Sequence, residues 1–113
     1  MKKYFLALLL ALACSSEKVE KPAYLMTKEQ MVAFLIDTHL TEGNLQTIKI
    51  NRDSLALIFY EMEKDLYAKH GIDSAQFMMS YHFYLHEAEE LSEIYDAVID
   101  SLNLKEKMLN NGQ

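Results

Sequence analysis

The sequence predicts an all-α protein, a small bundle of four helices at about residues 27–46, 53–70, 74–85 and 88–108, which follow a signal peptide and a short tether. Apolar residues recur at three- and four-residue spacing through most of this region, and no stretch shows the alternation of a β-strand above that helical pattern. Capping residues divide the periodic region into separate helices.

The N-terminus has the pattern of a secretory signal. Lys2 and Lys3 make its start positive, residues 4–12 are apolar, and the small residue Ala13 precedes Cys14. A helix that crosses a bilayer needs ~20 apolar residues, and the polar residues after Cys14 end this run too early. Residues 1–13 are therefore predicted to be a cleaved signal peptide.

Cys14 is the only cysteine in the sequence. Residues 11–14 resemble a bacterial lipobox, in which the thiol is acylated and the chain is cut just before it, although Ala11 stands where Leu is usual. The resemblance implies lipid attachment at Cys14 and a place in the cell envelope, and Ser15 favours the outer membrane, on its periplasmic or its surface face. Several acyl chains would hold the protein firmly on a bilayer. The alternative is an incidental cysteine beside an ordinary cleavage site.

Composition indicates one domain behind a flexible segment. Residues 14–25 contain the only proline and no apolar period, so they are predicted to be the lipidated N-terminus and a tether, followed by a helical domain at 26–109 and a frayed tail at 110–113. The chain has 11 basic and 17 acidic residues, and loss of Lys2 and Lys3 changes its net charge from −6 to −8. An acidic chain is poorly suited to bind nucleic acid or anionic lipid. We expect the membrane contact to be made by the N-terminal lipid.

The first helix has a clear start. Thr27 and Gln30 match a capping box, and Met26 and Met31 are placed for a hydrophobic staple. The face expected to meet the core carries Val32, Leu35, Ile36, His39 and Leu40. The opposite face carries Glu29, Ala33, Asp37 and Thr41.

The second helix is predicted to begin at the N-cap Asp53-Ser54. Its core stripe is Leu55, Ile58, Phe59, Met62 and Leu66. Gly71 followed by the apolar Ile72 is typical of a Schellman motif, which would end the helix at His70.

The third and fourth helices could be one, because the apolar spacing continues from residue 77 to residue 102. Asp73 is expected to cap the third helix, with Gln76 in the capping-box position. Acidic residues crowd positions 87–93, and Lys105 and Lys107 lie towards the far end, which is the arrangement that the dipole of a helix starting near residue 88 favours. We therefore predict a break at 85–88.

A candidate binding face consists of His39, Glu42, Tyr81, His82 and Tyr84. Tyrosine brings an apolar body and a polar tip to a ligand groove, and His39 and Glu42 share a helix face. The alternative roles are structural, with His39 in a buried hydrogen bond to Glu42 or to a tyrosine hydroxyl, and with Tyr81 and Tyr84 in the core. Phe83 falls off the apolar stripe and is expected to mark an exposed contact patch.

No motif for a metal, a cofactor or an enzyme is present. His82 and His86 have the spacing of two ligands of one metal, but no zinc motif accompanies them. The sequence has three glycines, too few for a phosphate loop, and neither G-x-S-x-G nor H-E-x-x-H. We predict no metal site, no cofactor and no enzymatic activity.

Four segments in order resemble one protein family: residues 37–42, 67–77, 80–84 and 94–102. The chain is similar, over about residues 22–104, to small helical lipoproteins of Bacteroidota-type bacteria known only as a domain of unknown function. Members often have Pro where this chain has Ala88, which agrees with a helix that begins there. The resemblance implies the fold and an envelope location, and it brings no substrate, cofactor or partner.

Two functions remain open. The leading hypothesis is a lipid-anchored, non-catalytic interaction or accessory module of the cell envelope, with another envelope protein as its partner. The alternative is a carrier of a small ligand or a metal that uses His39, Glu42 and His82.

Overall fold

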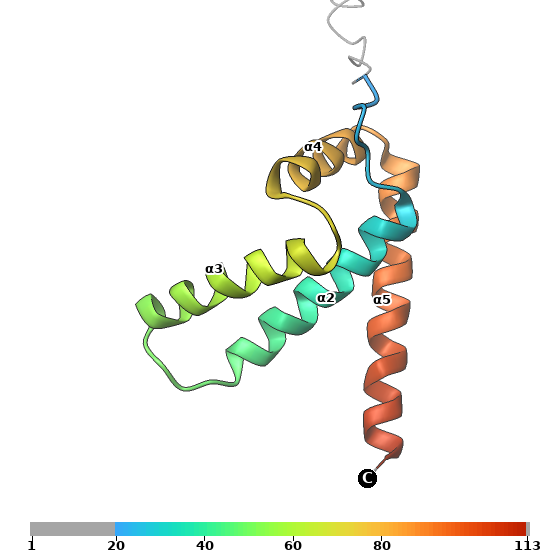
Figure 1. Ribbon diagram of the computed structural model, residues 1–113. Coiled ribbons are helices and arrows are strands. Elements are labelled where there is room, and N and C mark those ends of the chain that lie inside the picture. Colours follow the sequence, from blue (N-terminus) through green and yellow to red (C-terminus); the bar gives the residue numbers. More distant parts are fainter. Residues whose placement is uncertain (1–19, 113) are drawn as a thin grey trace, which may run out of the picture.

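The computed structural model describes residues 20–112, which contain four α-helices and no strand. The helices are α2 (Lys28–Gln46), α3 (Arg52–Lys69), α4 (Ser74–Leu85) and α5 (Ala88–Asn111), and they confirm the predicted all-α fold (Figure 1). The predicted signal peptide, Cys14 and the first part of the tether lie outside the described residues. None of the described helices is both long and apolar enough to span a bilayer.

The start of α2 is as predicted. Thr27 Oγ1 accepts a hydrogen bond from the Gln30 backbone N–H at 3.1 Å, and Gln30 Oε1 accepts one from the Thr27 N–H at 2.9 Å. Met26 and Met31, on either side of this capping box, are completely buried. A good N-cap contributes about 1 kcal/mol, and here it also fixes the direction in which the chain enters the core.

The predicted faces of α2 are partly wrong. Phe34 is buried, Asp37 is mostly buried against α3, and His39 is exposed. The reason is that α2 has two neighbours, because α5 packs on one side of it and α3 on another. The spacing of apolar residues predicts a single buried face. Helix α2 instead buries part of one face against α5 and part of another against α3.

The first turn of α3 also differs from the prediction. Asn51 is the N-cap in place of Asp53-Ser54, because its Oδ1 accepts a hydrogen bond from the Ser54 N–H at 2.8 Å. Of the predicted core stripe, Leu66 is buried, Ile58 is exposed, and the rest is partly buried. Helix α2 is the principal neighbour of α3. One helix alone does not cover the whole apolar stripe of α3.

The end of α3 confirms the Schellman motif. Gly71 has φ +65°, a backbone conformation that favours glycine. The Ile72 N–H donates to the Tyr67 carbonyl at 3.0 Å, and the Gly71 N–H donates to the Ala68 carbonyl at 3.2 Å.

The predicted break between the third and fourth helices is confirmed. Asp73 Oδ1 caps α4 by accepting from the Gln76 N–H at 2.7 Å, and α4 ends at Leu85. The next helix begins at Ala88 with acidic residues in its first turn. It continues to Asn111, past the predicted end at 108 and into the predicted tail.

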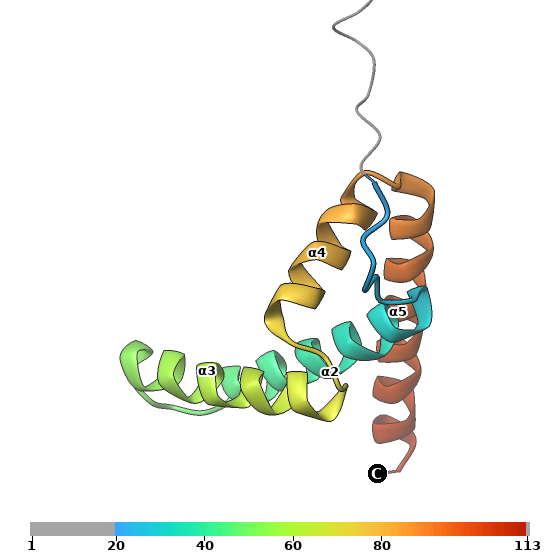
Figure 2. The ribbon, with the colours of Figure 1, turned by 45° about the horizontal axis from the view of Figure 1, so that its top comes forward.

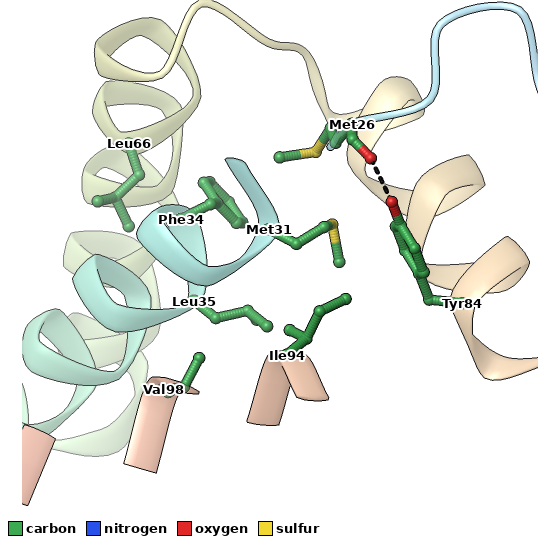
Figure 3. Packing of buried hydrophobic residues seen from close by; sticks show 8 residues of the cluster. All are labelled: Met26, Met31, Phe34, Leu35, Leu66, Tyr84, Ile94 and Val98. Carbon is green, nitrogen blue, oxygen red and sulfur yellow. Dashed lines mark hydrogen bonds between the residues drawn. The ribbon is translucent and has the colours of Figure 1, made fainter. Parts of the chain in front are cut away.

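One hydrophobic cluster joins the helices. Figure 3 shows its eight buried members, which are Met26, Met31, Phe34, Leu35, Leu66, Tyr84, Ile94 and Val98. Every completely buried polar side-chain atom in residues 20–112 has a hydrogen-bond partner. The cluster lies where the first half of α2 crosses α5 and where α4 covers the start of α5.

The four helices form an open arrangement. The main contacts are α2 with α5, α2 with α3, and α4 with α5. The α2–α3 hairpin leads away from α5, as both views show (Figures 1 and 2). The outer part of the hairpin and the last turns of α5 therefore project from the core.

Candidate functional site

The predicted binding face is not one surface. His39 Nδ1 and Glu42 Oε2 are 3.6 Å apart on α2, and both side chains are partly exposed. His82 is exposed on α4, and α2 packs mainly against α3 and α5. Within residues 20–112, no group of three His, Cys, Asp or Glu side chains could hold a metal ion. His39 makes neither of the buried contacts that were its alternative role.

Tyr81 and Tyr84 take the structural role. The Tyr84 hydroxyl donates to the Met26 carbonyl at 2.7 Å (Figure 3), and the Tyr81 and Tyr95 hydroxyls lie 2.8 Å apart between α4 and α5. Burial raises the pKa of Tyr84. Burial, and then the hydrogen bond with Tyr81, raise the pKa of Tyr95 to about 12. The Tyr84 and Tyr95 hydroxyls therefore stay protonated at neutral pH. The Tyr84 bond holds the N-terminal segment against α4, and the Tyr81–Tyr95 contact joins α4 to α5. Phe83, predicted to be exposed, is partly buried against Tyr84.

The N-terminal arm, residues 20–26, lies against α4. Its backbone is held by three side chains spaced four residues apart on that helix, Gln76, Ser80 and Tyr84. Gln76 Nε2 donates to the Tyr24 carbonyl at 3.0 Å, and the Met26 N–H donates to Ser80 Oγ at 2.9 Å. Ser80 is completely buried. The end of the predicted tether is thus fixed to the folded domain before α2 begins.

A second polar cluster joins α2 to the end of α3. Asp37 Oδ2 accepts hydrogen bonds from Lys69 Nζ and His70 Nε2, each at 2.8 Å. The His70 ring meets Phe34 edge-on, with ring centroids 5.5 Å apart. The hydrogen bond from Lys69 lowers the pKa of Asp37 more than any other contact, burial opposes it, and His70 lowers it further. The geometry suits a contact that closes the base of the hairpin.

Sequence reasoning missed this cluster and the aromatic contacts beside it. Phe34 stacks on Tyr67 at 5.4 Å between centroids and lies 4.6 Å from the ring of Phe77. A signal was available, because Asp37 opens the first segment of the family resemblance and Lys69 and His70 stand in the second. The structure shows that these two segments contact each other through Asp37, Lys69 and His70.

A long groove runs between α2 and α5. It consists of two adjoining hollows of about 450 Å³ and about 430 Å³, which share Ala33 and Ile36. The ion pair of Lys28 Nζ with Glu93 Oε2, at 2.7 Å, stands at one end. Leu104 and Met108 line the other end and are largely exposed. We call this the α2–α5 groove. An apolar floor with a charged rim is the usual form of a groove that binds a helix.

The comparisons with known proteins give one family. A model described as a domain of unknown function (DUF4296) matches residues 22–108. The matched range contains all four segments on which the resemblance was based. No curated protein and no solved structure matches the chain.

Proposed function

The chain belongs to the DUF4296 family of unknown function, and from that premise we propose that it is a lipid-anchored protein of the bacterial cell envelope, of the Bacteroidota type, that acts as a non-catalytic interaction module. Its partner is an envelope protein that places an amphipathic helix in the α2–α5 groove. The outer membrane is the expected location, given Ser15 after the acylated Cys14. The single observation that carries the interaction is the groove.

Both walls of the groove are helices, α2 and α5, and their side chains form the ridges and grooves against which another helix can pack. The apolar side chains of α5 pack against the hydrophobic cluster as far as Leu102. Beyond it, Leu104 and Met108 are largely exposed and line a hollow beside α2. A helix laid beside Ile36 and Leu104 would continue the side-chain packing that already joins α2 to α5. Lys28 and Glu93 at one end and Lys105 at the other supply rim charges of both signs.

The position of the N-terminal arm supports an anchored module. The arm meets the domain beside α4 and the start of α5, and the C-terminal end of α5 lies at the opposite end of the described chain (Figure 1). A lipid at Cys14 would therefore leave the far part of the groove turned away from the bilayer. The alternative of a ligand or metal carrier has less support, because His39 and Glu42 lie on α2 and His82 lies on α4, which is not a main neighbour of α2.

The lipid is tested by metabolic labelling with an alkyne fatty acid. The wild-type protein should be labelled and stay with membranes after a salt wash, and Cys14→Ser should be neither labelled nor retained. A wild-type protein that is unlabelled and washes off would end the proposal of an anchor.

The groove is tested in cells by photocrosslinking. A photoreactive residue at Leu104 or Met108 should give an adduct with one helical envelope protein, and the same residue at Glu106, which is exposed but does not line the groove, should not. Leu104→Asp should abolish the adduct from Met108, because a charge on the floor opposes apolar contact. Equal adducts at all three positions, or none, would contradict the groove, and an adduct between two copies of this chain would replace the partner by a homodimer.

A further inference from the structure

Two exposed methionines mark a second surface, on α4. Met78 is 68% exposed and Met79 is 52% exposed, although methionine is among the residues most often buried in proteins. They line one hollow of about 560 Å³ together with His82 and residues 20–23 of the N-terminal arm. None of these side chains contributes to the hydrophobic cluster.

Helix geometry places the three side chains together. His82 follows Met78 by four residues and Met79 by three, so both methionines are its neighbours on the surface of α4. A methionine side chain has three rotatable bonds and can turn its sulfur towards a common point. The arm forms the other wall, and its attachment through Tyr24 and Met26 fixes that wall in place.

The ring of His82 also has a defined neighbour. The ring of His86 meets it edge-on, with centroids 4.9 Å apart. His86 Nδ1 lies 3.0 Å from the His82 carbonyl oxygen and must be the donor, because a carbonyl can only accept.

The chemistry of this set is soft. Thioether sulfur selects monovalent copper among the biological metals, imidazole also binds copper, and Mg²⁺ and Ca²⁺ prefer oxygen. The charged side chains that line the hollow, Glu20 and Lys21, have opposite signs, so the neutral sulfur and nitrogen atoms decide what binds there.

We propose that Met78, Met79 and His82 form a binding site for Cu(I). The ion is bound as Cu(I) and does not change its oxidation state, so the site needs no oxidant or reductant. No metal motif marks these residues in the sequence, and the site shares no side chain with the α2–α5 groove. Either proposal can therefore fail without the other.

The first experiment is a competition for Cu(I) with the chelator bicinchoninate under anaerobic conditions. It uses the full chain with Cys14→Ser, which removes the only thiol. This protein should withdraw one Cu(I) per chain from the chelator. Loss of even an outer-sphere contact weakens metal sites by about 10–100-fold, so His82→Gln, and the double change Met78→Leu with Met79→Leu, should each weaken binding at least ~10-fold.

The matched controls are Met108→Leu and His39→Gln. Met108 is 66% exposed on α5 and His39 is exposed on α2, so these changes remove the same atoms elsewhere on the surface and should leave the affinity unchanged. Circular dichroism should show equal helix content in all variants. Failure of the parent chain to withdraw Cu(I), or equal affinity in the double variant and Met108→Leu, would overturn the site.

A second measurement needs no substitution at the site. Ag(I), which has the same charge and ligand preference without redox chemistry, should shift the methyl carbon resonances of Met78 and Met79 and leave that of Met108 in place. X-ray absorption of the copper complex should show sulfur and nitrogen neighbours. Unshifted methyl resonances, or copper with nitrogen and oxygen neighbours alone, would contradict the proposal.

Discussion

The two ends of α2 have different surroundings. At its N-terminal end, Met31 is completely buried among residues of α4, α5 and the N-terminal arm. At the hairpin tip, which we define as residues 44–58, Leu45 is buried, and Ile48, Ile50, Leu57 and Ile58 are exposed. Both ends have regular helices with good caps, so the difference lies in how many segments surround them. Burial, and the stability that comes with it, is concentrated at the N-terminal end of α2.

This contrast predicts unequal local stability. Segments with few buried apolar contacts open at lower free energy than the rest of the chain. Among the backbone amides that donate hydrogen bonds within helices, those of the hairpin tip should exchange faster than those of residues 31–38 in α2 and 91–98 in α5.

The largest effect is expected in the hydrophobic cluster. Ile94→Ala removes a side chain that is 1% exposed and should lower the free energy of unfolding by about 2–5 kcal/mol. The matched change at the tip, Ile58→Ala, should cost less than ~1 kcal/mol, because Ile58 is already partly exposed to water. Urea unfolding followed by circular dichroism measures both. Equal losses would show that the tip is as well packed as the cluster.

The next effect concerns the attachment of the arm. Ser80→Ala leaves the buried Met26 N–H without a partner and should cost about 1–3 kcal/mol. It should also expose the arm to protease cleavage near Tyr24. Ser74→Ala, at an exposed position in the first turn of α4, is the control and should leave both readouts near wild type. Unchanged cleavage in Ser80→Ala would mean that the arm is held by other contacts.

The contact at the base of the hairpin should give a smaller effect that depends on pH. Asp37→Asn weakens the bonds from Lys69 and His70 and should cost about 1 kcal/mol at neutral pH. The folded-state pKa of Asp37 lies below its ordinary value of 3.8, so this stability is fully present above that value and is lost as the pH falls through the folded-state pKa. The difference between variant and wild type should therefore shrink towards zero in acid.

A control for Asp37 is available on the same helix. Glu42→Gln changes a carboxylate that is 3.6 Å from His39 and partly exposed, and it should have little effect at any pH. Amide exchange in α3 should quicken in Asp37→Asn and not in Glu42→Gln. A difference from wild type that persists in strong acid, after Asp37 has been protonated, would assign the effect of Asp37→Asn to packing instead of charge.

The smallest effect is expected at the rim of the groove. Lys28 Nζ lies 2.7 Å from Glu93 Oε2, which is shorter than the Asp37 contacts, but both side chains are exposed to solvent. Lys28→Gln should leave the midpoint of thermal unfolding unchanged within error, in low salt and in high salt. If Lys28→Gln lowered the unfolding midpoint clearly in low salt and not in high salt, the ion pair would stabilise the fold despite its exposure to solvent.

The same contrast explains how much could be predicted from the sequence. The helix boundaries were accessible because their signals are local: Thr27 with Gln30, Asp73 with Gln76, and Gly71 with Ile72 each act within a few residues. The N-cap predicted at Asp53-Ser54 was wrong, and Asn51 caps α3. Both Asn and Asp side chains can cap a helix, and these two stand two positions apart. Local chemistry did not decide between them.

The burial of Asp37 and the exposure of His39 could not be predicted in this way. Both depend on α3 packing beside α2, a contact between residues more than thirty positions apart along the chain. The predicted binding face required α2 to lie against α4, but α5 and α3 are its main neighbours. Met78 and Met79 were missed for another reason, because a periodic pattern counts methionine as apolar and takes no account of its sulfur.

The N-terminal arm has a mechanical consequence. Tension applied at the N-terminus would act first on the hydrogen bonds that join the arm to Gln76, Ser80 and Tyr84, and only then on the first turn of α2. Met26 stands directly before Thr27, the N-cap of α2. Pulling Met26 away would therefore take its buried side chain out of the hydrophobic cluster. A pull on the N-terminus would thus be resisted first by the contacts of the arm with α4, and it would reach α2 only after those contacts break.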